Sequence, residues 1–157
     1  MHVETAGLSD VETLAKLNQH VQGLHLDSAP RFFRQPTLAE VASAFREFLQ
    51  QESAKGYLAY VGSCAVGYVL AVIRRRPEDT FCTARTFMYV DQLSVDPSYQ
   101  RRGVGRGLLE AVMRYAQESG IDDIEVETWA FNTAAQDFFG SFGFAPRAIR
   151  LRMSHQE

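Results

Sequence analysis

Residues 88–119, MYVDQLSVDPSYQRRGVGRGLLEAVMRYAQES, decide the fold of this chain. The first eight are rich in aromatic and β-branched side chains, which predicts a buried strand over residues 88–95. Pro97 ends that strand, because proline has no amide N–H to give to a sheet. Apolar residues then recur at helical spacing over residues 104–115, and Gly120 stands where the helix would end. The stretch therefore predicts a strand, a tight turn and an amphipathic helix.

Three glycines stand at the start of this predicted helix: Gly103, Gly105 and Gly107. A glycine inside a helix costs about 1 kcal/mol relative to alanine, so stability alone does not favour them. They make sense if the backbone approaches a ligand closely and presents bare amide groups to it. Helix N-termini bind phosphate well, and three arginines lie nearby. The stretch predicts a phosphate or pyrophosphate site; a helix start with solvated arginines is the alternative.

Two well-known phosphate loops do not fit this stretch. The Rossmann fingerprint is G-x-G-x-x-G, whereas these glycines fall as G-x-G-x-G, and the Gly-Lys-Ser/Thr end of a Walker A loop is missing. Residues 100–105 do match Q-x-x-G-x-G, and they resemble the pyrophosphate loop of GNAT-superfamily N-acetyltransferases. A second match lies further along the chain. Where that family commonly has Asn, Ala, Tyr and Gly-Phe, this chain has Asn132, Ala135, Phe139 and Gly143-Phe144.

The resemblance implies an acetyl-CoA-dependent N-acetyltransferase that moves an acetyl group to a primary amine by direct attack on the thioester. It places the backbone of Leu93 and Val95 beside the pantetheine arm of the co-substrate, and Asn132 near the same arm. The residues that it places at the pyrophosphate are Arg101, Arg102, Gly103, Val104, Gly105 and Arg106.

The chemistry also asks for a base. An amine of pKa about 10.4 is protonated at neutral pH, so a carboxylate that takes its proton, directly or through water, helps the attack. Asp91 lies four residues before Val95, where members of the resembled family often carry such an acid. Its apolar and aromatic neighbours would raise its pKa. An aspartate that only solvates the end of the sheet is the alternative. A backbone N–H of the same strand is the expected oxyanion donor.

Phe139 departs from the family pattern, because it stands where the family usually has a tyrosine acid. Tyr99, Tyr89 or Tyr68 could substitute, and nothing in the sequence selects one. Phe139 itself is expected to form a wall of the thioester pocket. The departure keeps a non-catalytic acyl-CoA-binding regulatory module open as an alternative. A nucleotide-binding protein that uses the glycine loop for a different phosphate is a further alternative.

The acceptor site is expected in one connecting segment. The segment between the first two predicted helices often lines it in the resembled family, which selects His25, Phe33 and Arg34. A loop histidine with satisfied hydrogen bonds is the alternative for His25. The acceptor is expected to be a primary amine of a small molecule or a peptide. Its identity and the oligomeric state, a homodimer included, stay open.

Composition sets the remaining limits. The 157 residues suit one domain, and 46% hydrophobic with 22% charged residues is typical of a globular protein. A net charge of −3 gives no reason to expect a nucleic-acid partner. Cys64 and Cys82 lack metal-ligand or CxxC spacing, so we expect reduced thiols in a cytoplasm and no metal. We expect neither a signal peptide nor a membrane span.

The whole pattern predicts one acetyltransferase-like domain, residues 1–157, of α/β (α+β) class: a mixed, mostly antiparallel sheet flanked by helices, with acyl-CoA N-acyltransferase-like architecture. A three-strand meander would be antiparallel, and the strand–helix–strand passage would be a parallel, right-handed crossover. Strands are expected over residues 2–6, 56–61, 65–73, 88–95, 122–129 and 147–153. Helices are expected after capping boxes at residues 9–12 and 37–40, from residue 104, and over residues 132–141.

Overall fold

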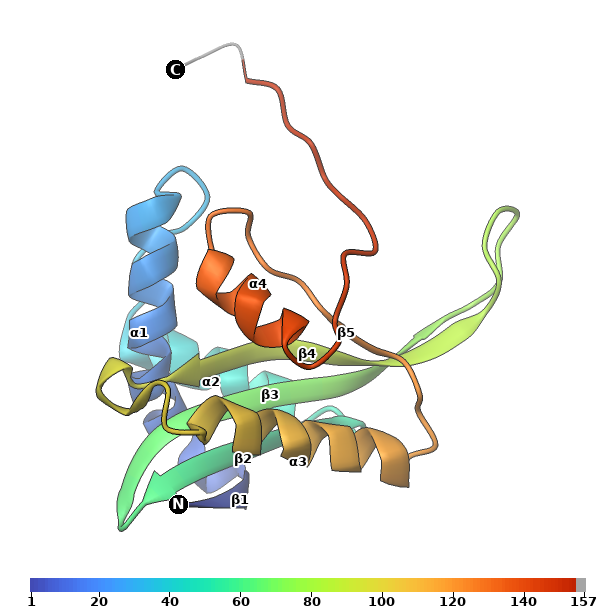
Figure 1. The fold of residues 1–157 in the computed structure, drawn as a ribbon. Helices are drawn as coiled ribbons and strands as arrows, with labels where there is room; N and C mark the ends of the chain where they lie inside the picture. The colour runs from blue at the N-terminus through green and yellow to red at the C-terminus, as the bar shows by residue number, and fades with distance from the viewer. Residues whose placement is uncertain (155–157) are drawn as a thin grey trace. The chain divides into compact units, whose positions relative to one another are not determined.

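A computed structural model describes residues 1–154. The chain forms two compact units, Met1–Glu127 and Thr128–Glu157. The first contains strands β1 (His2–Ala6), β2 (Ala54–Val61), β3 (Cys64–Arg76), β4 (Arg85–Val95) and β5 (Ile124–Val126) (Figure 1). It also contains helices α1 (Val11–Ser28), α2 (Leu38–Leu49) and α3 (Val104–Glu118), and the 3₁₀ turns η1 (Leu8–Asp10) and η2 (Pro97–Tyr99). Helix α4 (Thr133–Gly140) belongs to the second unit.

The strands form one sheet in the order β1-β2-β3-β4-β5. The first four pair antiparallel, and β4 pairs with β5 in parallel through the α3 crossover. The prediction of a mixed, mostly antiparallel sheet is therefore confirmed.

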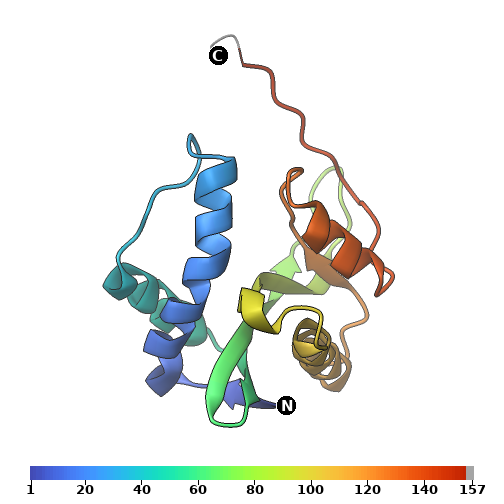
Figure 2. The same cartoon turned by 60° about the vertical axis from the view of Figure 1, so that its left-hand side comes forward.

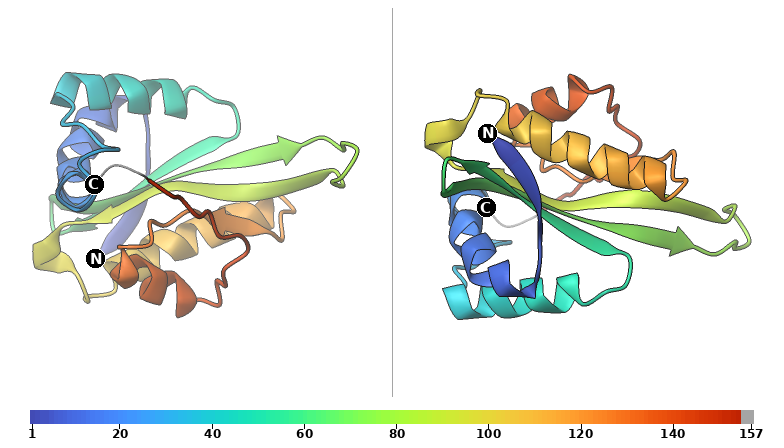
Figure 3. Two further views of the ribbon diagram at one scale, coloured as in Figure 1. Left: turned by 90° about the horizontal axis from the view of Figure 1, so that it is seen from above. Right: turned by 90° about the horizontal axis from the view of Figure 1, so that it is seen from below.

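Helices cover both faces of this sheet. Helices α1 and α2 lie on one face and α3 on the other (Figures 2 and 3). On the first face, buried side chains from α1, α2, β2 and β3 form one cluster that includes Leu14, Leu17, Phe45, Leu58, Tyr68 and Leu70. On the second face, a Cβ at Gly67 would meet Val104 and Leu108 of α3 at 3.2 and 3.3 Å. The close approach of α3 to β3 thus depends on a glycine in the strand.

Strand β4 carries an irregularity that positions the site. Leu70 pairs with Gln92 while the next residue, Ala71, pairs with Val90, so Asp91 is the extra residue of a β-bulge. The β4–β5 register ends at the pair Val90 and Val126. From Asp91 onward, the structure over residues 1–154 pairs β4 with β3 alone. Bulges re-aim side chains and end pairing, and this one stands where the sheet opens.

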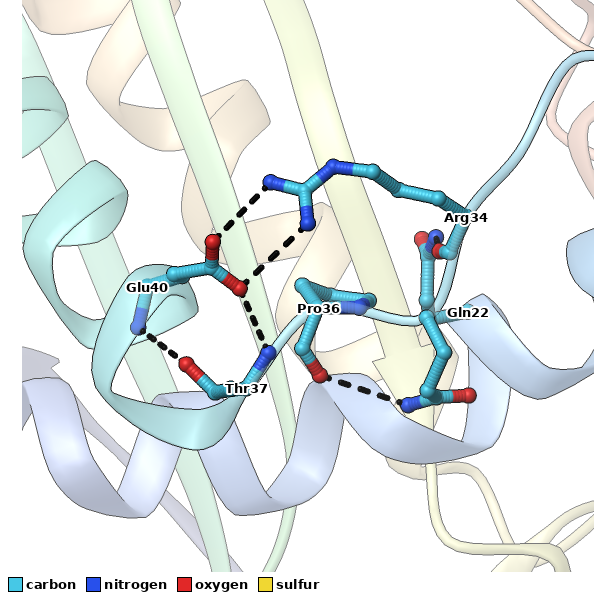
Figure 4. Close-up of polar contacts among 6 residues, drawn as sticks. Gln22, Arg34, Pro36, Thr37 and Glu40 are labelled. Atoms are coloured by element: carbon cyan, nitrogen blue, oxygen red, sulfur yellow. Dashed lines mark hydrogen bonds and ion pairs between the residues drawn. The ribbon is translucent and has the colours of Figure 1, made fainter.

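One prediction about α1 is wrong. The capping box of residues 9–12 does not form; instead the Gly7 amide donates to Asp10 Oδ2 over 2.8 Å, and a 3₁₀ turn precedes Val11. Helix α1 runs through Gly23 to Ser28. The second capping box is confirmed: Glu40 N donates to Thr37 Oγ1 over 3.1 Å, and Thr37 N donates to Glu40 Oε2 over 2.7 Å (Figure 4).

The final predicted strand is also wrong. Residues 147–153 have irregular backbone, and Ile149, Leu151 and Met153 are exposed. Alternating apolar residues make a strand only where a neighbouring strand accepts their hydrogen bonds, and the five strands over residues 1–154 do not pair with this segment. Among the described residues, none of the helices has both the length and the apolar character needed to cross a membrane.

Candidate active site

Asp91 lies at the bulge with its side chain 29% exposed. Burial raises the pKa of its carboxyl above the ordinary value, and the positive charge of Arg74 partly opposes that rise. Arg74 Nη2 lies 3.8 Å from Asp91 Oδ1, and the same guanidinium lies 3.6 Å above the centre of the Tyr89 ring. A partly buried carboxylate with a raised pKa suits proton transfer near neutral pH better than a solvated one does.

A buried hydrogen-bond network adjoins Asp91. The hydroxyl of Tyr68 donates to Gln92 Oε1 over 2.8 Å, and Asn18 Nδ2 donates to both of these oxygens over 2.9 Å. Tyr68 is 0% exposed, and burial raises the pKa of its hydroxyl. Of the three tyrosines considered as substitute acids, Tyr68 is therefore the least suited, because its proton is engaged and hard to release.

The backbone of β4 offers an open edge beyond the bulge. Asp96 N donates to Val66 O of β3 over 2.8 Å, so Val95 directs its amide and carbonyl to the opposite edge. Leu93, two residues earlier, has the same orientation. Within residues 1–154, the Val95 carbonyl accepts a hydrogen bond from Gln100 Nε2 over 3.4 Å, whereas the Leu93 main chain and the Val95 amide stay outside the pairing of β4. The pantetheine assignment uses groups of this kind.

The glycines at the start of α3 differ in their structural roles. Gly103 has φ 82°, a left-handed conformation that L-residues adopt only with strain, and it begins α3 with no side-chain cap among residues 1–154. The first-turn amides are therefore not covered by a capping side chain. Gly107 instead faces β1, where an added Cβ would lie 3.0 Å from Met1 Cε. The prediction that all three glycines serve a ligand thus holds less well for Gly107, which has a packing role.

The arginines of this loop also differ. Arg101 and Arg102 are exposed before the helix, and the Arg102 guanidinium lies 5.5 Å from the centre of the Tyr99 ring. Arg106 Nη1 lies 3.8 Å from Glu110 Oε1, one turn along the helix. The positive charge available at the helix start comes mainly from the first two.

The predicted acceptor residues lie at the end of α1 and in the connection to α2. His25 stacks on Phe33 with ring centres 4.7 Å apart, and burial lowers the pKa of the imidazole. Arg34 donates to both carboxylate oxygens of Glu40, over 3.2 and 3.4 Å (Figure 4). The structure therefore brings His25 and Phe33 together, whereas Arg34 supports the capping box of α2.

Two predicted cofactor residues lie in the second unit. Asn132 Oδ1 accepts a hydrogen bond from Ala135 N over 3.1 Å and so caps α4. Phe139 is 6% exposed and makes edge contacts with Phe138 and Phe144, at 5.1 and 5.3 Å between ring centres. Both residues have structural roles within their unit.

Sequence reasoning missed three residues near Asp91: Asn18, Arg74 and Gln92. Asn18 stands among apolar residues of α1 and is buried, and a polar residue at a core position of a helix is a signal that could have selected it. Arg74 and Gln92 have no such signal, because the Arg74 contact with Asp91 and the Gln92 hydrogen bonds with Asn18 and Tyr68 join segments that are far apart in the sequence.

Comparison with known proteins identifies the family of this chain. A model of the Acetyltransferase (GNAT) family matches residues 20–144. An aminoglycoside N(6')-acetyltransferase type 1 of Salmonella enteritidis is 26% identical over 136 residues, covering 86% of this chain and 90% of that protein. A ribosomal protein bS18 alanine N-acetyltransferase of Escherichia coli is 40% identical over 58 residues, covering 37% of this chain and 39% of its own.

Solved structures support the fold. The crystal structure of a tetramutant of the BH1408 protein from Bacillus halodurans has a TM-score of 0.92 at 22% identity, covering 98% of this chain and 99% of that one. An aminoglycoside 6'-N-acetyltransferase from Acinetobacter haemolyticus has a TM-score of 0.77 at 16% identity, covering 100% and 99%. An aminoglycoside acetyltransferase in complex with a CoA bisubstrate analogue has a TM-score of 0.74 at 22% identity, covering 98% and 97%. The chain therefore belongs to the GNAT family of acetyltransferases and is an acetyl-CoA-dependent N-acetyltransferase.

Proposed function

We propose that the chain acetylates a primary amine by direct attack of the amine on the thioester, with Asp91 as the general base. The observation that carries this proposal is the position of Asp91, the bulged residue where the sheet opens, with a pKa that burial raises. The amine nitrogen forms a bond to the carbonyl carbon, the carbon–sulfur bond breaks, and the proton of the amine passes to Asp91 or to water. A β4 backbone amide at Leu93 or Val95 donates to the carbonyl oxygen as negative charge develops there.

The co-substrate would lie along the open edge of β4 and across the start of α3. The first-turn amides at Val104, Gly105 and Arg106 would bind the pyrophosphate, with Arg101 and Arg102 adding charge. Gly103 supports this proposal. It has a left-handed backbone conformation and begins α3, which lacks a side-chain cap over residues 1–154. Asn132 and Phe139 remain assigned to the pantetheine arm and the thioester by resemblance.

Departure of the thiolate would not depend on a tyrosine. A thiol of pKa about 8.5 leaves fairly well as its anion, so a positioned acid helps without being required. Phe139 occupies the place of the family's tyrosine, and Tyr68 is buried with its proton engaged. Tyr89 and Tyr99 remain the candidates for a substitute acid.

We further propose a small-molecule amine as the acceptor. The aminoglycoside-modifying relative matches along 90% of its length, whereas the ribosomal-protein-modifying relative matches along 39%. A match along nearly the whole chain includes the region before the loop, which carries the acceptor side of the site. His25 and Phe33 offer a stacked, partly buried pair there.

The two units are proposed to act as one domain, because the family match over residues 20–144 crosses their boundary. A cytoplasmic location is proposed from the exposed free cysteines Cys64 and Cys82, which suit a reducing compartment.

Two measurements test the proposed function. Release of free thiol from acetyl-CoA over a panel of aminoglycosides, simple alkylamines and peptides identifies the acceptor class; release with peptides alone would contradict the choice of a small molecule. Calorimetric titration of Gly105→Val with coenzyme A tests the loop. We expect weakened binding in a folded variant, and unchanged affinity would remove the loop from the site.

A further inference from the structure

The network of Asn18, Tyr68 and Gln92 has a feature that the proposed mechanism does not use. Gln92 Oε1 accepts two hydrogen bonds, from the Tyr68 hydroxyl over 2.8 Å and from Asn18 Nδ2 over 2.9 Å. Two donors occupy both lone pairs of a carboxamide oxygen. The amide of Gln92 is therefore held in one orientation by two buried side chains.

This orientation leaves the amide nitrogen available. Over residues 1–154, the side-chain hydrogen bonds of Gln92 all go to its oxygen, so both N–H donors of Nε2 remain for solvent or a ligand. Gln92 is only half-buried, unlike Tyr68. Turning the Gln92 amide over by itself would place Nε2 against Asn18 Nδ2, two donors face to face, so the network opposes it.

The available donors lie beside the proposed base. Gln92 follows Asp91 in β4, beyond the point where pairing with β5 ends. The charge of Asp91 raises the pKa of Tyr68, which places its carboxylate within electrostatic range of the hydroxyl that holds Gln92. A proton acceptor and a neutral double donor thus adjoin one another at the opening of the sheet.

We infer that Gln92 Nε2 donates a hydrogen bond to an oxygen of the acceptor, and that Gln92 is a specificity-determining residue for amines carrying such an oxygen near the nitrogen. Amino sugars, amino alcohols, amino ethers and aminoacyl groups belong to this class, whereas plain alkylamines do not. Asn18 and Tyr68 act as positioning residues for the Gln92 amide. The inference rests on the proposed function and names the substrate class of that same site.

The test compares 2-methoxyethylamine with butylamine, which differ by an ether oxygen in place of a methylene. For the wild type, Gln92→Glu and Gln92→Met, thiol release at saturating acetyl-CoA gives the ratio of kcat/KM for the two amines. Comparing this ratio between variants cancels the difference in amine basicity. Gln92→Glu keeps an oxygen for Tyr68 and Asn18 but replaces the outward donors with a carboxylate oxygen.

We expect the ratio to fall about tenfold in both variants, the loss of one hydrogen bond. A Gln92→Glu ratio equal to that of the wild type would overturn the inference, because the outward group would then not be a donor. Asp91→Asn serves as the control for the base, because it should slow both amines. If Asp91→Asn slows both while the Gln92 variants keep the ratio, the inference fails and the proposed function stands.

A binding measurement on the wild type makes the test independent of whether the variants fold. The side-chain amide signals of Gln92 are assigned in a ¹⁵N–¹H NMR spectrum by their loss in Gln92→Met or by sequential assignment. In the presence of coenzyme A, 2-methoxyethylamine should shift them and butylamine should not. Equal shifts with both amines, or none with either, would overturn the inference. Tyr68→Phe should weaken the discrimination in part, since one of the two hydrogen bonds to Oε1 is lost.

Discussion

Asp91→Asn separates chemistry from binding at the proposed site. The change keeps the shape of the side chain and removes its ability to take a proton. At pH about 7.4, roughly one in a thousand molecules of an amine with pKa 10.4 is neutral. General bases contribute about 10²- to 10⁴-fold, so we expect turnover to fall ~10²-fold or more while acetyl-CoA affinity changes little.

The rate of the Asp91→Asn variant should also depend on pH in a distinctive way. Without the base, the amine must bind already neutral, so the rate of the Asn variant should rise about tenfold per pH unit toward the amine pKa. The difference in rate between the variant and the wild type should therefore become smaller as the pH rises. Asp79→Asn is a matched control, since Asp79 accepts hydrogen bonds from Phe81 and Cys82 in the exposed β3–β4 hairpin.

The same variant should be more stable at neutral pH. The pKa of Asp91 is raised in the folded protein, so the contribution of this carboxyl to stability is present below its unfolded pKa and is lost as the pH rises through its folded pKa. Asparagine cannot ionise and avoids that loss. Thermal melts should show a higher Tm for Asp91→Asn near neutral pH, with the gain disappearing in acid. A turnover loss below about threefold, or a lower Tm at neutral pH, would refute the assignment.

Three further predictions concern neighbouring residues. Gly103→Ala should weaken coenzyme A binding up to about tenfold, because an L-residue at φ 82° costs about 1–2 kcal/mol and favours a different loop conformation. Gly107→Ala should bind within about twofold of wild type in calorimetry, because its Cβ would meet only the flexible end of Met1 closely, at 3.0 Å, and Val3 at an ordinary 3.5 Å. Arg74→Gln should move the acidic limb of the kcat/KM profile to higher pH, since the lost cation no longer opposes the raised pKa of Asp91; an unmoved limb would contradict this. At high pH we expect no fall in kcat from a tyrosine; a fall that Tyr89→Phe or Tyr99→Phe abolishes, with a large loss of rate, would reveal a substitute acid.

The local elements were predictable because their signals are local. The strand, turn and helix over residues 88–119, the capping box at Thr37 and the helix end at Gly120 all depend on neighbouring residues, and the structure confirms each. The capping box at residues 9–12 failed because the chain begins to turn earlier, in a 3₁₀ turn that has Gly7 as its N-cap and Asp10 as the residue that accepts from the Gly7 amide. The strand over residues 147–153 failed because alternation does not say which strand would pair with it.

The candidate site was predictable in part for the same reason. The loop was predicted from its motif and Asp91 from the chemistry of amine attack. Asp91 lies at the bulge of β4, and the loop leads into α3. The bulge, the contact of Arg74 with Asp91 and the hydrogen bonds of Gln92 depend on register between strands far apart in sequence. Such register follows from three-dimensional packing and is not readable from one strand alone.

Amine-dependent release of thiol from acetyl-CoA tests the central claim most directly. With the wild-type chain, free thiol should appear only when an accepted amine is present, in equal amount to an N-acetylated product identified by mass spectrometry, and Asp91→Asn should lose at least about 10²-fold of that rate at neutral pH. Tight binding of coenzyme A without amine-dependent release over the whole panel would contradict the account and indicate a binding protein instead.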